Sequence, residues 1–235
     1  MKALGLIPAR GGSKGIPGKN IRSILGRSLI ERAFSSATES GVLDRIVLST
    51  DDPAIAAEAH RIGLDVPFLR PEEFAGDASP MIDVAIHALK MLASENYKPD
   101  VLVLLQPTSP LRTAEHIRHA LKLLMGYDSV CTVVPVPKDL CPHYLMKIGD
   151  SGLLEFVMPD GSRYTRRQDV PQAYRRDGTL FVTRAPVILK QRSFYGERCI
   201  PYILSPDESM NIDTPEEWVE AETRLALNEM KGTPS

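Results

Sequence analysis

Three cationic side chains near the start of the chain could bind phosphate groups. Arg10, Lys14 and Lys19 follow a short apolar run at Leu4–Pro8, and four glycines lie among them. Glycine lets a backbone approach a ligand closely, and successive N–H groups in such a turn form an anion-binding concavity. An arginine fork can also grip phosphate oxygens bidentately. The stretch therefore predicts a phosphate site directly after a buried strand.

This loop matches neither of the common phosphate-binding motifs. A P-loop would need glycine at Ser13 and Ser or Thr at Asn20, and the Rossmann G-x-G-x-x-G is missing after the first strand. A surface turn with solvated lysines is the alternative. Because Pro8 and Pro17 bracket the loop after an apolar strand, we favour ligand binding.

A second chemical group lies near the end of the chain, at Asn211 and Asp213. Side chains two apart on an extended segment point the same way. A carboxylate that faces a triphosphate would carry Mg²⁺, which takes one or two carboxylates together with phosphate oxygens. The alternative for Asp213 is a cap for the helix after it. A third polar group, Gln106, ends the apolar run Val101–Leu105.

The elements that must position these groups alternate between helical and strand patterns. This alternation predicts an α/β fold with a mostly parallel sheet. Polar caps predict helix starts at Ser28, Asp52, Ser79, Thr113 and Thr214. The turn-rich stretch 137–171 breaks the alternation, and we expect a β-hairpin excursion there. On the helices, we expect His87, His116 and His119 to face solvent, the last two in preference to a metal pair.

Composition limits the remaining possibilities. A length of 235 residues fits one globular domain, or one domain with an appendage. A net charge of −2 gives no support for nucleic acid as a partner. No apolar run is long enough to span a membrane, and the N-terminus lacks a signal-peptide pattern. Three widely spaced cysteines favour buried free thiols and a cytoplasmic location.

Four segments resemble the acylneuraminate cytidylyltransferases, which make CMP-sialic acid and related CMP-activated nine-carbon acidic sugars. They are L-I-P-A-R-G-G-S-K-G-I-P-G-K-N at the front, L-Q-P-T-S-P-L-R after the central strand, Q-A-Y-R-R-D-G, and the segment around Asp213. The resemblance runs from about Lys2 to about Leu225. It implies a Rossmann-like nucleotidyltransferase sandwich, with a β-hairpin dimerisation extension at about residues 137–175 of a single domain 1–235. It also implies a homodimer that uses CTP and releases pyrophosphate.

The resemblance assigns roles to particular residues. It implies catalytic roles for Arg10, Lys19 and Asp213, and a Mg²⁺ site at Asp213 and Asn211. Asn211 stands where the family commonly has the first acid of a D-x-D motif, so Asp213 keeps the main role. Nucleotide binding is implied for Ala9, Arg10, Gly11, Gly12, Ser13, Lys19, Asn20, Arg70 and Ser79. Sugar binding is implied for Gln106, Arg167, Arg175, Phe194 and Tyr195.

Some of these roles compete with simpler ones. Five arginines lie between residues 163 and 176. We expect Arg167 and Arg175 to bind anions, and Arg163, Arg166 and Arg176 to be solvated. For the aromatic pair, ordinary core packing is an equal contender. The rival functions are a cytidylyltransferase for 3-deoxy-manno-octulosonate or another sugar, and a non-catalytic nucleotide-binding protein. Only Asn211 favours the last.

Overall fold

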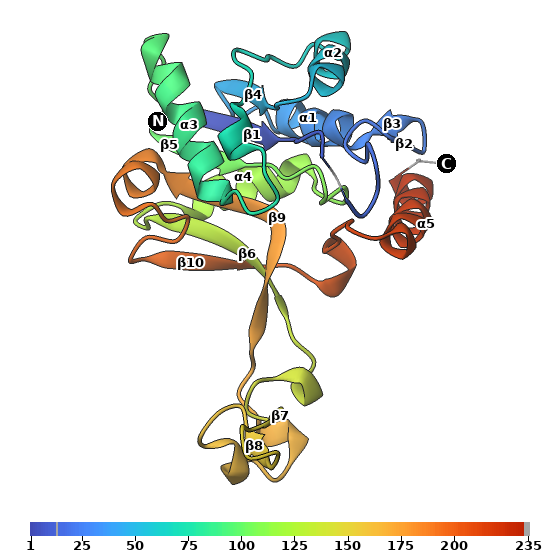
Figure 1. The fold of residues 1–235 in the computed structure, drawn as a ribbon, viewed down its shortest axis with the longest axis vertical. Helices are drawn as coiled ribbons and strands as arrows, with labels where there is room; N and C mark the ends of the chain where they lie inside the picture. Colours follow the sequence, from blue (N-terminus) through green and yellow to red (C-terminus); the bar gives the residue numbers. More distant parts are fainter. Residues whose placement is uncertain (13, 233–235) are drawn as a thin grey trace.

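A six-stranded, mostly parallel sheet forms the centre of the molecule (Figure 1). The computed structural model describes residues 1–12 and 14–232. The strand order is β10-β6-β9-β5-β1-β4, and β9 runs antiparallel to both of its neighbours while the other pairs are parallel. The strands are β1 (Ala3–Pro8), β4 (Arg45–Ser49), β5 (Val101–Leu104), β6 (Ser129–Pro135), β9 (Tyr174–Arg184) and β10 (Cys199–Ile203). The predicted α/β fold is confirmed.

Helices cover both faces of this sheet. The helices are α1 (Leu29–Ser40), α2 (Pro53–Arg61), α3 (Met81–Ser94), α4 (Ala114–Leu123) and α5 (Pro215–Gly232). β1 is buried along its whole length, as a central parallel strand must be. Its Leu4 and Leu6 pack with α3 on one face, and Ile7 packs with α1 and α4 on the other. In the part of the chain described, no helix is both long and apolar enough to cross a bilayer.

Four of the five predicted helix caps are present. The hydroxyl of Ser28 accepts a hydrogen bond from the backbone of Glu31, and the carboxylate of Asp52 accepts one from Ala54. Thr113 and Thr214 cap α4 and α5 in the same way. Each cap satisfies a backbone N–H that has no partner within its helix. These contacts fix where the loops at the ends of the sheet turn into helices.

The prediction for Ser79 as a cap is wrong. Pro80 occupies the cap position of α3 and makes no side-chain capping bond, and the hydroxyl of Ser79 donates to the carbonyl of Glu73, 3.1 Å away. Pro80 keeps the chain extended just before the helix. The serine therefore ties down the preceding loop instead of the helix end.

The prediction of solvated histidines is also wrong for His87 and His116, and it is confirmed for His119, which is exposed. The ring of His87 lies 5.0 Å from that of Phe68 and 5.3 Å from that of Phe74, and burial lowers its pKa. His116 is buried, and its Nε2 lies 3.3 Å from a carboxylate oxygen of Glu208. No group of three or more His, Cys, Asp or Glu side chains that could hold a metal ion occurs among the described residues.

A third cluster of apolar side chains brings the end of the chain onto its beginning. Ile16 from the glycine loop packs with Ile212 and with Trp218 of α5. The short hairpin of β2 (Ser23–Ile24) and β3 (Arg27–Ser28) contributes Ile24 to the same cluster. Trp218 is buried in this cluster and anchors the last helix. This packing holds the segment around Asp213 against the loop that carries Arg10 and Lys19.

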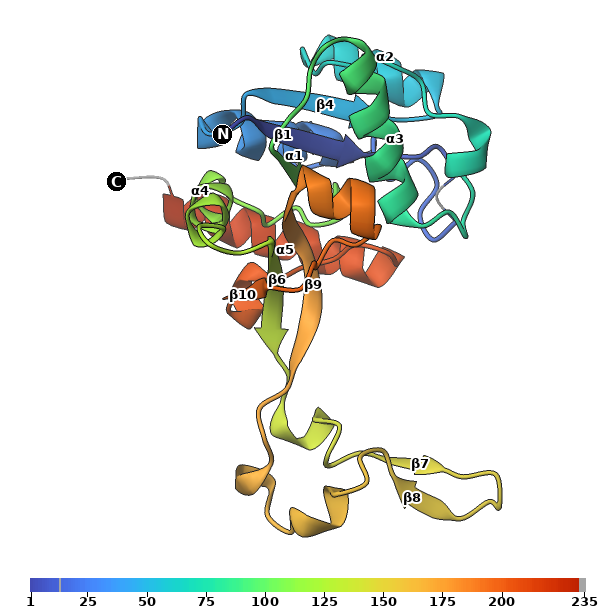
Figure 2. The same ribbon diagram turned by 90° about the vertical axis from the view of Figure 1, so that its left-hand side faces the viewer.

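An extension projects away from the sheet between β6 and β9. Figures 1 and 2 show it as a stalk that ends in the hairpin of β7 (Met146–Ile148) and β8 (Leu154–Phe156). Its remaining structure is made of short 3₁₀ turns. The predicted hairpin excursion from the βα pattern is confirmed. β9 continues from the stalk into the sheet.

Candidate functional site

A cavity of about 390 Å³ opens at the carboxyl ends of β1 and β5. Open α/β sheets bind ligands at this edge. The cavity brings together six of the predicted site residues: Arg10, Lys19, Asn20, Arg70, Gln106 and Asp213. Its other lining residues are Pro8, Lys14, Gly15, Asp77, Met81, Pro107 and Thr108.

Lys19 joins the front of the chain to its back. Its ammonium donates to the carboxylate of Asp213 at 2.7 Å and to the carbonyl of Ile212 at 2.9 Å. Gly15 makes this approach possible, because a Cβ at that position would overlap the carbonyl oxygen of Asp213. The two ends of the chain therefore share one pocket.

Asp77 neutralises the other cations of the loop. Its carboxylate lies 2.6 Å from the guanidinium of Arg10 and also pairs with Lys14. Hydrogen bonds from Lys14 and Arg10 lower the pKa of Asp77. Asp77 lies in a loop with no recognisable motif, so no pattern in the sequence indicates its role.

Arg70 forms a buried part of the cavity wall. Its Nε donates to the hydroxyl of Ser49 at 3.0 Å, and its guanidinium also donates to the carbonyl of Ser49. Burial lowers the pKa of Arg70 to about 10, with Arg10 acting in the same direction and Asp51 opposing it. These bonds hold a cationic group at the edge of β4, inside the site.

Other residues predicted to bind the nucleotide lie beside the cavity and do not line it. The backbone N–H of Ala9 donates to Ser49, and that of Gly11 donates to the carboxylate of Asp51, 3.2 Å away. Gly12 is exposed with open space around it, and the hydroxyl of Ser79 is engaged by the carbonyl of Glu73. Ser13 lies outside the described residues.

Arg112 holds the backbone of Gln106 in place. Nη2 of Arg112 donates to the carbonyl of Gln106 at 2.8 Å, and Nη1 donates to the carbonyl of Thr179 at 3.0 Å. Burial lowers the pKa of Arg112 to about 9. The side-chain amide of Gln106 lies beside Gly178, where a Cβ would come within 3.5 Å of its nitrogen. Arg112 belongs to the L-Q-P-T-S-P-L-R segment, but spacing alone did not indicate its role.

A second cavity, of about 350 Å³, adjoins the first and shares Met81 and Gln106 with it. The predicted pair Phe194 and Tyr195 lines this cavity. The ring of Phe181 lies 5.7 Å from that of Phe194. The aromatic pair thus packs against Phe181 and also faces open space. The other lining residues are Ile82, Leu104, Arg176, Phe181, Arg192 and Ser193.

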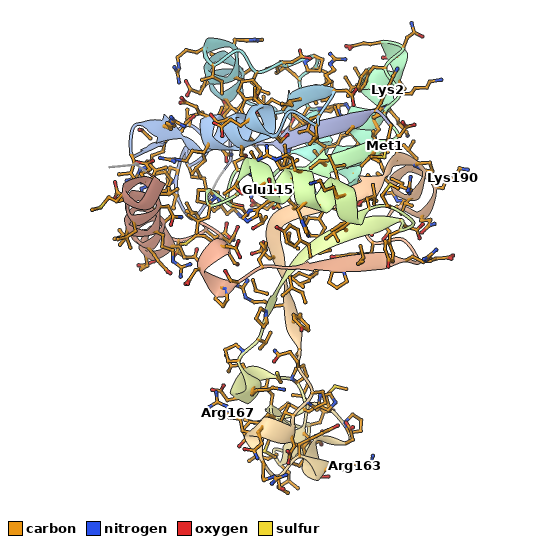
Figure 3. The ribbon with its side chains drawn as sticks, turned by 180° about the vertical axis from the view of Figure 1, so that it is seen from behind. Met1, Lys2, Glu115, Arg163, Arg167 and Lys190 are labelled. Carbon is orange, nitrogen blue, oxygen red and sulfur yellow. The ribbon has the colours of Figure 1, made fainter. Side chains whose placement is uncertain are left out.

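The two arginines predicted to bind the sugar lie away from both cavities. Nη2 of Arg175 donates to the hydroxyl of Ser209 at 3.3 Å. Arg167 lies in the extension, as Figure 3 shows, and pairs with Asp139 at 3.3 Å. Arg176, for which we expected plain solvation, is exposed and also lines the second cavity.

The geometry around Asp213 fits a magnesium ion. Nδ2 of Asn211 donates to the carboxylate of Asp213, which leaves the amide oxygen of Asn211 free to bind a metal or water. The side chain of Asp213 is 61% exposed. One carboxylate and one amide oxygen match an ion that takes its remaining ligands from phosphates and water.

Comparison with known proteins identifies the family of this chain. The cytidylyltransferase family profile matches residues 4–231. The chain is 36% identical to the CMP-N,N'-diacetyllegionaminic acid synthase of Legionella pneumophila, covering 97% of this chain and 98% of that protein. It is 31% identical to the N-acylneuraminate cytidylyltransferase of Escherichia coli over 90% of this chain. It covers only 49% of that longer relative.

Solved structures share the fold at low sequence identity. A CMP-2-keto-3-deoxy-manno-octonic acid synthetase in complex with CTP superposes with a TM-score of 0.73 at 15% identity, covering 97% of this chain and 100% of that one. A 4-diphosphocytidyl-2C-methyl-D-erythritol synthase from Anaerococcus prevotii gives a TM-score of 0.63 at 15% identity, with 96% and 98% covered. The fold is therefore that of the nucleotidyltransferases. With a family profile that spans nearly all of its length, and with the cations of that family's opening motif gathered around one pocket, this chain belongs to the cytidylyltransferase family.

Proposed function

We propose that this cytidylyltransferase transfers CMP from CTP to the anomeric hydroxyl of an acidic nine-carbon sugar. The observation that carries the proposal is the pair of adjoining cavities. The first is lined by Arg10, Lys19 and Asp213, and the second by the aromatic pair, with Gln106 in both. The first would hold the nucleotide and the second the sugar. The relatives in Legionella pneumophila and Escherichia coli carry the names of enzymes for such sugars.

In the proposed reaction the sugar hydroxyl attacks the α-phosphorus of CTP in line. A new phosphorus–oxygen bond forms, the bond to pyrophosphate breaks with its electron pair leaving on pyrophosphate, and the hydroxyl proton passes to solvent water. Arg10 and Lys19 neutralise charge on the triphosphate, and catalysis is positioning plus electrostatic stabilisation. Asn20 supports this arrangement, because its amide donates to the carbonyl of Arg10 at 3.1 Å and fixes the loop.

Asp213, with the amide oxygen of Asn211, is the proposed place for Mg²⁺. When bound, the ion would supply Lewis-acid polarisation of a phosphoryl oxygen. The protein's own contribution is to hold one exposed carboxylate against the triphosphate site, where Lys19 keeps it oriented. Asn211 carries no charge, so we expect Asp213 to dominate metal binding.

The extension is the proposed dimer contact. It exposes large apolar side chains, with Ile148 76%, Leu153 70% and Leu154 67% exposed. Exposed apolar patches of this kind mark interaction sites. In a homodimer, Arg167 of one chain would approach the sugar site of the other chain. It would then bind an anionic group of that sugar, because within its own chain it lies away from both cavities.

A test of the dimer is the molar mass in solution by light scattering. We expect a dimer for the wild type and a monomer for Leu154→Glu. Met125→Glu is the matched control, because Met125 is 79% exposed and lies outside the extension. A monomeric wild type would remove this part of the proposal.

The reaction itself is tested by pyrophosphate release from CTP and Mg²⁺ with a panel of sugar acids. The panel contains sialic, legionaminic and pseudaminic acids and the eight-carbon 3-deoxy-manno-octulosonate. We expect turnover with at least one nine-carbon acid. Turnover with only the eight-carbon acid would select the rival substrate, and CTP binding without any turnover would select a non-catalytic protein.

The free thiols also fit a cytoplasmic location, which we propose with the function.

A further inference from the structure

Arg175 and Arg176 are neighbours on β9 but serve different faces of it. Successive side chains on a strand point to opposite sides. Arg175 reaches Ser209, whereas Nη1 of Arg176 donates to the phenol oxygen of Tyr195 at 2.6 Å. Arg176 is therefore fixed at the aromatic cavity by one of the residues that line it.

The positive charge of Arg176 is available to a ligand. Within the described ranges, residues 1–12 and 14–232, Arg176 forms no ion pair, and no carboxylate lines the cavity with it. The other cation there, Arg192, is already paired with Asp83 of α3. One guanidinium with unused donors thus faces an adjoining space of about 350 Å³.

Much of the remaining lining of the cavity is apolar. Ile82, Leu104 and Phe194 line the cavity together with the ring of Tyr195. A group that suits such a space presents an oxygen acceptor to the arginine and a small apolar body to the rings. An acylamino group has this shape, with a carbonyl oxygen beside a methyl group. A protonated amine at the same place would instead be repelled by the guanidinium.

We propose that Arg176, oriented by Tyr195, binds the carbonyl oxygen of an acylamino substituent on the sugar and so selects acylated sugar acids over their free amines. This inference rests on the proposed function. Arg176 is then a specificity-determining residue, and the sugar's acyl group occupies the cavity between α3 and β9. The methylene stem of the arginine and the rings enclose the methyl group.

The test compares wild type, Arg176→Ala and Tyr195→Phe with an acylated nine-carbon acid that the wild type uses and with its de-N-acylated amine. Loss of a charge-assisted hydrogen bond should lower kcat/KM for the acylated acid by about 10-fold or more in Arg176→Ala. The KM for CTP should stay unchanged, and kcat/KM for the amine should be equal or higher. Tyr195→Phe should shift the preference in the same direction, but less.

Lys122→Ala is the charge-matched control, because this lysine is exposed and lies on α4 away from both cavities. Equal losses for the acylated acid and the amine would overturn the inference and assign Arg176 to the sugar carboxylate. Unchanged kinetics in Arg176→Ala would also overturn it. Failure of the proposed function is distinct, because it would appear as a wild type that uses no nine-carbon acid. Thermal unfolding of each variant checks that the fold is retained.

Discussion

Lys19→Ala is the sharpest test of the site. The side chain of Lys19 is only 13% exposed, and its ammonium bridges Asp213 and the carbonyl of Ile212. Removal of one preorganised donor at a developing charge costs about 2.7–4 kcal/mol, or about 10²–10³ in kcat. We therefore expect turnover to fall by about that factor.

The same variant should be nearly as stable as the wild type. The carboxylate of Asp213 is 61% exposed, so loss of its pair costs about 0–1 kcal/mol. For a chain of this size, a loss of 1 kcal/mol lowers the melting temperature by about 2–4 °C. A large loss of activity with a small change in melting temperature separates a catalytic role from a structural one.

The assay is pyrophosphate release at saturating CTP, Mg²⁺ and sugar, with thermal unfolding measured on the same preparations. Lys19→Arg retains the charge and should recover part of the rate. Lys122→Ala again provides the control for loss of a positive charge. Turnover by Lys19→Ala within about tenfold of wild type would refute the electrostatic reasoning, since it would leave less than about 1.4 kcal/mol for this group.

Three further predictions test other parts of the structure. Gly15→Ala should lower the melting temperature and weaken CTP binding, because its Cβ would overlap the carbonyl oxygen of Asp213, whereas Gly12→Ala has open space and should unfold in calorimetry at the same temperature as the wild type. Burial lowers the pKa of His87, so the unfolded chain binds the proton more tightly than the folded protein does. The free energy of unfolding should therefore fall as the pH drops below about 6.5. In His87→Gln, the urea concentration at the unfolding midpoint should depend less on pH between about pH 5 and 8 than it does in the wild type. Arg112→Met should cost about 1–3 kcal/mol for each carbonyl left unpaired and raise the sugar KM more than the CTP KM, as measured by denaturant titration and kinetics.

The sequence was sufficient to predict the strand that leads into the glycine loop, because a continuous apolar run at Leu4–Pro8 fits only a buried position. It also predicted the caps at Asp52 and Thr113, which depend on side chains next to the backbone groups that they satisfy. These features are local. The meeting of Lys19 with Asp213 was reached only through the resemblance, since it spans 194 residues.

The wrong predictions for His87 and His116 have a common physical cause. Whether His87 or His116 faces solvent depends on segments distant in sequence, such as the loop at Phe74 and the turn at Glu208, which cover those rings. Periodicity along one helix cannot report what packs on it from outside. In the same way, strand alternation separates Arg175 from Arg176 but does not say which face meets Tyr195.

Three of the cations that line the site are paired with carboxylates before any substrate arrives. Asp77 pairs with Arg10 and Lys14, and Asp213 pairs with Lys19. A triphosphate must therefore exchange ion pairs with these carboxylates, so its binding energy is smaller than a sum over its new contacts.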